Sequence, residues 1–112
     1  MRTAVVEVRS IVGMLVAGEW ALLDRLTPGS AVSAAELRSA VIDYGQTLVM
    51  PPAAALAQLD AIEVEGASQR TLDVRIPLWT VEEGRSDLQL VLTLKEVADG
   101  LWDAEVDDLL VP

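Results

Sequence analysis

The apolar positions in the first part of the chain follow a helical period. They recur every three or four residues, which places them on one stripe of a helix that Gly18 is placed to end. The stripe consists of Val5, Val8, Ile11, Val12, Leu15 and Val16. Residues 19–26 repeat the pattern with Trp20, Leu23 and Leu26, before a Thr-Pro-Gly turn. The pattern therefore predicts two helices in the first 26 residues.

A third helix is predicted after Ser33. Ser33 and Glu36 have the spacing of a capping box, in which each side chain bonds the backbone N–H of the other residue. Gly45 supplies the left-handed conformation that commonly follows the C-terminus of a helix. The residues expected to face inward on this helix are Leu37, Ala40, Val41 and Tyr44. Prolines at positions 51 and 52 then favour extended backbone.

The second part of the chain switches to a period of two, which is typical of β-strands with one buried face. Apolar and polar residues alternate around positions 62–64, 72–78, 88–94 and 102–106. The predicted fold class is α+β, with about three N-terminal helices packed on one face of a curved, four-stranded antiparallel meander. We expect a single domain over residues 1–112, with a helical half, 1–56, and a β-sheet half, 57–112.

Most of the net charge lies in the predicted sheet half. The 112 residues carry 8 basic and 18 acidic side chains, a net charge of −10. Residues 1–56 contribute −1 and residues 57–112 contribute −9. This balance disfavours nucleic acids and anionic membranes as partners and favours a basic protein.

The residue types that are missing also narrow the chemistry. The chain has no His and no Cys, which excludes Ser-His-Asp and Cys-His catalysis and zinc sites built from these ligands. No cofactor is expected. Glu7 and Arg9 interrupt the N-terminal apolar run, and its longest uncharged stretch, residues 10–18, is far below the roughly 20 residues of a membrane span. A cytoplasmic location is therefore expected.

Three stretches of the chain resemble known families. They are YGQTLVMPP at 44–52, LWTVEEGRSDL at 78–88 and WDAEVDD at 102–108. Together with the order of helices followed by a curved antiparallel sheet, the chain resembles the NTF2-like (cystatin-like) α+β superfamily and also an uncharacterised family of small bacterial proteins. The resemblance implies a fold and not one activity, because NTF2-like scaffolds include isomerases, dehydratases, binding modules and toxin-immunity proteins.

Asp103, Glu105 and Asp107 alternate along the last predicted strand and therefore share one face. Such a row is typical of a solvated strand face, and it also suits the binding of a basic partner. One straight strand cannot surround a metal ion, so no metal site is predicted.

One weak catalytic pair can be built from Tyr44 and Asp108. The alternation places Asp108 on the inward face with Trp102, where its pKa would be raised, and Tyr44 could donate a hydrogen bond to an oxyanion. The pocket between helices and sheet would be lined by Trp20, Tyr44, Met50, Trp102 and Asp108. The alternatives are that the strand ends before Asp108 and that Tyr44 is a half-buried core residue with a solvated hydroxyl.

The segment from Trp79 to Asp87 is a second candidate interaction surface. Trp79 follows the inward-facing Leu78, so its ring should point outward. The turn after it is densely charged and resembles a recognition loop, although such turns are commonly ordinary hairpin tips. The candidate partner-binding residues here are Trp79, Glu82, Glu83, Arg85 and Asp87.

Three functions are compatible with these patterns. The first is a non-catalytic binding protein, of the toxin-immunity type, that uses an acidic sheet face against a basic protein. The second is an NTF2-like small-molecule-binding protein or a lyase or isomerase, with a pocket between helices and sheet. The third is a structural homodimer formed through Trp79 and Val91.

Overall fold

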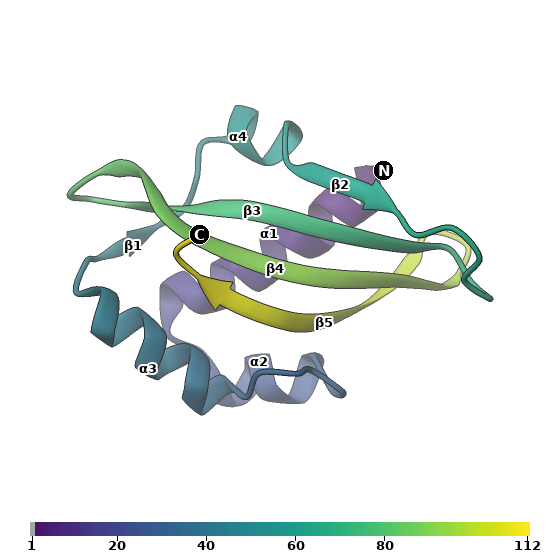
Figure 1. Ribbon diagram of the computed structural model, residues 1–112, viewed down its shortest axis with the longest axis horizontal. Helices are drawn as coiled ribbons and strands as arrows, with labels where there is room; N and C mark the ends of the chain where they lie inside the picture. The colour runs from purple at the N-terminus through teal and green to yellow at the C-terminus, as the bar shows by residue number, and fades with distance from the viewer. Residues whose placement is uncertain (1) are drawn as a thin grey trace.

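Residues 2–112 are described by the computed structural model, and within them four helices and five strands follow one another (Figure 1). The helices are α1 (Arg2–Ala17), α2 (Trp20–Leu26), α3 (Ala34–Tyr44) and α4 (Ala53–Ala57). The strands are β1 (Leu48–Val49), β2 (Asp60–Glu63), β3 (Thr71–Thr80), β4 (Gly84–Ala98) and β5 (Leu101–Leu110). The fold is α+β, with three helices before the first strand.

The three helices predicted from the apolar period are present. α1 ends just before Gly18, whose φ of 70° lies in the left-handed region. Ser33 and Glu36 form the predicted capping box at the start of α3, and Gly45 follows this helix with a φ of 78°. No helix within residues 2–112 is long and apolar enough to cross a membrane.

The apolar pattern does not predict two short elements between α3 and β2. β1 has two residues, and α4 has five, which is too few for either period to show. α4 begins directly after Pro52, because a proline at a helix start removes an N–H that would have no helical partner. Leu56 anchors α4 to the core, with only 3% of its surface exposed.

The sheet has five strands rather than the predicted four, in the order β1-β3-β4-β5, with β2 also paired to β3. All pairs are antiparallel, and β2 to β5 form the predicted meander. β1 pairs with residues 79–80 of β3 and β2 with residues 72–75, on the same edge. Residues 76–78 therefore have no strand partner on that edge, and α4 lies beside this gap (Figure 1).

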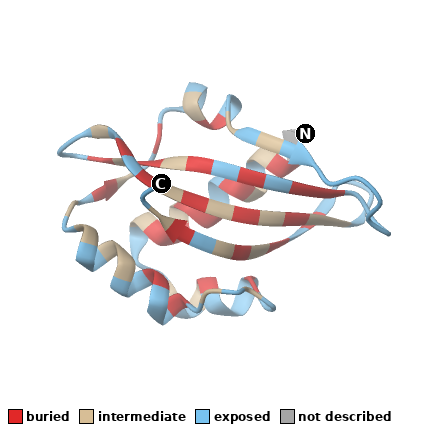
Figure 2. Cartoon of the chain, viewed as in Figure 1, coloured by how far each residue is buried: buried red, intermediate tan, exposed pale blue. Residues whose placement is uncertain are grey.

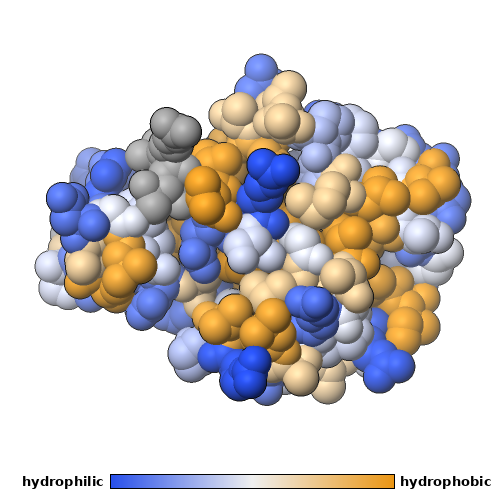
Figure 3. Space-filling model, turned by 180° about the vertical axis from the view of Figure 1, so that it is seen from behind, coloured by the Kyte–Doolittle hydropathy of each residue, from blue (hydrophilic) through white to orange (hydrophobic). Residues whose placement is uncertain are grey.

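Helix α1 covers one face of the sheet, and the opposite face is uncovered except where α4 borders it beside β3 (Figure 1). α1 runs behind β3, β4 and β5 in the view of Figure 1, and buried and exposed residues alternate along these strands (Figure 2). The inward residues of β3 and β4 include Leu72, Val74, Ile76, Leu90, Leu92 and Leu94, all at most 1% exposed. Seen from behind, apolar and charged residues are mixed on the surface (Figure 3). We call the face of the sheet turned away from α1 the open face.

Three register shifts interrupt the pairing of the strands, and one of them reverses the alternation of buried and exposed residues. Val91 pairs with Asp108 but Leu92 pairs with Val106, so Asp107 is the extra residue of a β-bulge in β5. A second shift lies between β3 and β4, where the one residue between Pro77 and Trp79 stands opposite residues 86–88, and a third lies between Glu96 and Ala98. Beyond the bulge at Asp107, the side chains of β5 point to the face opposite to the one that simple alternation gives, whereas the alternation of β3 continues unchanged to Thr80.

Candidate functional site

The open face carries a group of acids that the strand register brings together. Asp73 of β3 lies opposite Thr93 of β4, and Thr93 lies opposite Glu105 of β5. One pair further along, Lys95 lies opposite Asp103. We call the five outward acids the acidic strip: Asp73, Asp103, Glu105, Asp107 and Asp108.

Two contacts hold part of the strip in place. The Lys95 ammonium lies 2.8 Å from Glu105 Oε1, and this hydrogen bond raises the pKa of Lys95. Thr93 Oγ1 donates a hydrogen bond of 2.6 Å to Asp107 Oδ2. Asp73 and Asp103 are exposed and form no ion pair with any described residue. The strip and Lys95 together hold five carboxylates and one ammonium, a net charge of −4.

Glu7 of α1 is a carboxylate whose pKa is affected by one acid of the strip, Asp103. Burial of Glu7 raises its pKa, and the charge of Asp103 raises it further. The ionised form of Glu7 is therefore less stable in the folded protein than in the unfolded chain. This cost is present at neutral pH and is relieved as the pH falls through the raised pKa towards the ordinary value of a glutamate.

The charged turn between β3 and β4 is bound to the end of α3 and to Thr47, the residue before β1. Glu82 accepts hydrogen bonds from the Thr47 N–H at 2.9 Å and from the Thr47 hydroxyl at 3.1 Å. The Tyr44 hydroxyl donates a hydrogen bond of 2.6 Å to Glu83 Oε1, and this bond is the main reason that the pKa of Tyr44 is raised. Two of the predicted partner-binding acids therefore already bind groups of their own chain.

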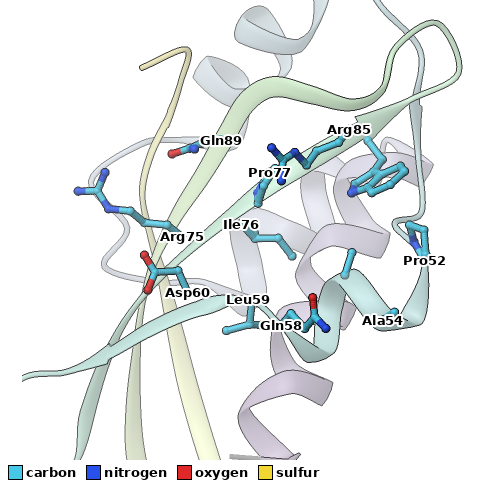
Figure 4. Close-up of a pocket in the computed structure, with 12 residues that line it drawn as sticks. Pro52, Ala54, Gln58, Leu59, Asp60, Arg75, Ile76, Pro77, Arg85 and Gln89 are labelled. Atoms are coloured by element: carbon cyan, nitrogen blue, oxygen red, sulfur yellow. The ribbon is translucent and has the colours of Figure 1, made fainter.

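A hollow of about 530 Å³ lies between α4 and the outward side chains of β3 and β4 (Figure 4). Trp79 and Arg85 line it, and the Trp79 ring is half-buried and points outward, as the alternation predicts. Arg75 and Gln89 line it too, although the sequence pattern does not single them out. Their alternation with buried residues is the signal that places them on the open face, but the pattern does not show that α4 encloses them.

Among the residues that the structure describes, no group of three or more carboxylates is close enough to hold an ion.

Comparison with known proteins places the chain in a family. The sequence model of the family described as Domain of unknown function (DUF7668) matches residues 12–112. The chain belongs to this family. No curated protein and no solved structure matches it. The DUF7668 match agrees with the resemblance to an uncharacterised family, whereas no match confirms the NTF2-like superfamily.

In this DUF7668 domain Asp108 does not face the helices, so the prediction of its inward position is wrong. The strand continues through Leu110, and Asp108 is exposed on the open face opposite Val91. The bulge at Asp107 is the physical reason, because one extra residue reverses the face of every side chain that follows. Its Oδ1 accepts a hydrogen bond from the Leu109 N–H at 2.8 Å.

The other residues of the predicted pocket do not converge on one cavity. Trp102 belongs to the core, with 6% of its surface exposed, and Met50 is exposed. Trp20 is half-buried at a shallow hollow beside Arg38, and the Tyr44 hydroxyl binds the hairpin turn. Apolar side chains from α1 and the sheet fill the layer between them. The DUF7668 domain therefore does not bring Tyr44 and Asp108 together.

We expect Glu82→Gln to flatten the acid side of the stability curve of this DUF7668 domain. The Thr47 N–H lowers the pKa of Glu82, so these bonds stabilise the fold above the ordinary glutamate pKa of about 4.3 and are lost as the pH falls through the lowered pKa. Thermal unfolding followed by circular dichroism from pH 7 to about pH 3 measures the effect. The wild type should melt higher than the variant near pH 7, and the difference should vanish in acid.

The control for this experiment is Glu65→Gln. Glu65 is exposed and makes no hydrogen bond with a described residue, so its replacement should leave the curve of the wild type unchanged. A difference between wild type and Glu82→Gln that stays constant with pH would show that the carboxylate charge is not what Thr47 recognises.

Proposed function

We propose that this protein is a non-catalytic binding protein whose acidic strip receives a basic segment of a protein partner. The observation that carries the proposal is the position of the strip on the sheet face that α1 leaves uncovered (Figure 1). Asp73 and Asp103 have exposed carboxylates without ion pairs among the described residues, so a partner could bind them without breaking a salt bridge.

The surroundings of the strip also suit a protein partner. Ile62 lies opposite Asp73 on the same face and exposes 61% of its surface, and Val91 lies opposite Asp108. Apolar side chains among charges supply buried area, while the charges steer encounter and set register. A toxin-immunity role is the special case in which the partner is a basic effector protein. The NTF2-like likeness is part of the same proposal, because that superfamily includes binding modules and immunity proteins.

The enzyme alternative lacks a comparable observation. It requires an acid and a hydrogen-bond donor at one cavity, and Asp108 and Tyr44 belong to different parts of the surface. The homodimer alternative rests on Trp79 and Val91, which are both half-buried on the open face. Sedimentation at high protein concentration distinguishes a dimer from a monomer.

The test uses a lysine-rich peptide as a probe of the strip. The variant Asp73→Lys/Asp103→Lys changes two of the three exposed strip acids. The control variant Asp43→Lys/Glu65→Lys makes the same change in net charge at exposed positions on α3 and in the loop after β2. Titration calorimetry at physiological salt should show the strip variant weakened by about tenfold or more. The control pair should stay within about threefold of the wild type, because screening confines charge effects to roughly 8 Å.

Two results would contradict the proposal. Equal weakening in both double variants would mean that the peptide senses only net charge. An unaltered affinity in the strip variant would mean that the binding surface lies elsewhere. Matched melting temperatures of the three proteins show that the comparison concerns binding and not folding.

A further inference from the structure

We propose that the hollow between α4 and the open face is a binding site for a small planar organic anion, such as an aromatic carboxylate. Its volume of about 530 Å³ falls within the range of small-molecule pockets. The site lies at a different place from the acidic strip and does not depend on the proposed function. The proposal rests on how the hollow forms, on its charges and on its aromatic wall.

The hollow is a consequence of the unusual edge of β3. Because β1 and β2 pair with separate parts of this edge, the chain between them leaves the sheet and forms α4. Pro77 lies in the part of β3 that has no strand partner on its outer edge, where a residue without an N–H is tolerated. Ala54 and Ala55 of α4 form one wall, and their small side chains leave the space open. The cavity is thus built by well-defined elements and not by a long loop.

Two arginines line the hollow, and neither forms a salt bridge with a described carboxylate. The sheet half contains four bases, of which Arg70 pairs with Glu63 at 3.0 Å and Lys95 pairs with Glu105 at 2.8 Å. Arg75 and Arg85 line the hollow, and neither guanidinium group forms an ion pair or a hydrogen bond with a described residue. Guanidinium groups bind carboxylates and phosphates through paired, charge-assisted hydrogen bonds. An anionic group on the ligand would supply the missing partner.

The aromatic wall of the hollow indicates a planar ligand. Trp79 lies opposite Arg85 across β3 and β4, so both residues lie at the same end of the hollow. Pro77 lies opposite Gln89 in the next pair, and Figure 4 shows Gln58 reaching in from the α4 side. Apolar walls with a few polar groups at defined points are the usual anatomy of a small-ligand site. A flat ring stacks on tryptophan at little entropic cost.

The position of Asp60 determines at which end of the hollow the anionic group of the ligand would bind. It also lines the hollow and lies opposite Arg75 across β2 and β3. Its carboxylate disfavours a second negative charge at that end and accepts hydrogen bonds there. The anionic group therefore belongs beside Arg85, and a ligand with an N–H or O–H at its other end gains a bond to Asp60.

The experiment follows the three tryptophan indole N–H signals by NMR while 2-naphthoate is added. The chain has three tryptophans, and among them only Trp79 lines the hollow. We expect a saturable shift of the Trp79 signal with a dissociation constant near or below about 1 mM. The signals of Trp20 and Trp102 should stay in place. Neutral 2-naphthamide and inorganic phosphate should each bind at least about tenfold more weakly, because the amide lacks the negative charge and phosphate lacks the aromatic ring.

Variants then test the two arginines. Arg85→Gln should weaken naphthoate about tenfold, and Arg75→Gln should weaken it less, because Asp60 already faces Arg75. Arg9→Gln removes an exposed arginine from α1 and should leave the affinity unchanged. Arg75 and Arg85 are both exposed, so circular dichroism should show that these variants are folded.

The proposal is overturned if naphthoate produces no saturable shift of Trp79, or if Arg85→Gln binds as tightly as the wild type. It is also overturned if the amide binds as well as the carboxylate, because the arginines would then have no role. Since the acidic strip is unchanged in all these proteins, failure here leaves the peptide experiment unaffected.

Discussion

Leu92→Ala should destabilise the protein by about 2–5 kcal/mol, a large share of the about 5–15 kcal/mol that stabilises a typical domain. Leu92 is fully buried in β4, the strand that lies between β3 and β5, and its register partners are Val74 and Val106. Both neighbours are at most 1% exposed, so the lost side chain leaves a cavity that rigid strands on either side cannot close. Thermal unfolding should occur about 10–25 °C lower than in the wild type.

The matched control is Leu101→Ala. Leu101 is also a strand leucine, but 60% of its surface is exposed at the start of β5. The same chemical change there removes little buried area, so the melting temperature should change by only a few degrees. Similar losses in both variants would mean that Leu92 does not lie at the centre of the core. The comparison thereby tests the arrangement of helices behind the central strand.

The elements with many periods were predictable from the sequence, because a repeated pattern averages over local exceptions. α1 and α3 follow from spacing and capping, and β3, β4 and β5 follow from alternation. α4 and β1 are too short to show a period, and their formation depends on what packs against them. Leu56 is buried by tertiary contacts that no local pattern records.

The candidate sites were less predictable than the fold, because they depend on register. The alternation gives the outward direction of Asp103 and Glu105, but a single inserted residue at Asp107 reverses the direction of Asp108. Predicting the hollow requires the order of the strands as well as the register, because α4 and β3 meet only since β1 and β2 share an edge of β3. From the sequence alone, Arg75 and Trp79 are predicted only to point outward from a strand, because the pairing of β1 and β2 with β3 is not known.

The charged hairpin turn between β3 and β4 is another feature whose role the sequence alone does not predict. Its composition resembles a recognition loop, and in the fold Glu82 and Glu83 bind Thr47 and Tyr44. Thr80 adds a hydrogen bond of 2.9 Å to Gln46, and its hydroxyl accepts one from the Glu83 N–H at 3.0 Å. Acidic composition therefore marks two kinds of surface in this protein. In the turn the acids hold the end of α3, and in the strip most of them face solvent.

Ser30→Ala should destabilise the protein by about 1–3 kcal/mol, more than the loss of an exposed serine hydroxyl would explain. Ser30 Oγ accepts a hydrogen bond from the Val106 N–H at 2.8 Å and donates one to the Thr27 carbonyl at 2.7 Å. The Val106 carbonyl in turn accepts a bond from the Ala31 N–H at 3.0 Å. The loop after α2 thus pairs with the outer edge of β5, where no further strand follows.

The variant would leave the Val106 N–H without its partner on an open strand edge, and an open edge is a template for pairing with another chain. We therefore expect Ser30→Ala to lower the melting temperature and to promote self-association at high concentration, measured by calorimetry and by sedimentation. Ser68→Ala is the matched control, because Ser68 is exposed in a loop and makes no side-chain hydrogen bond with a described residue. If both variants melt and sediment alike, water replaces the Ser30 hydroxyl at no cost, and the loop does not protect the edge of β5.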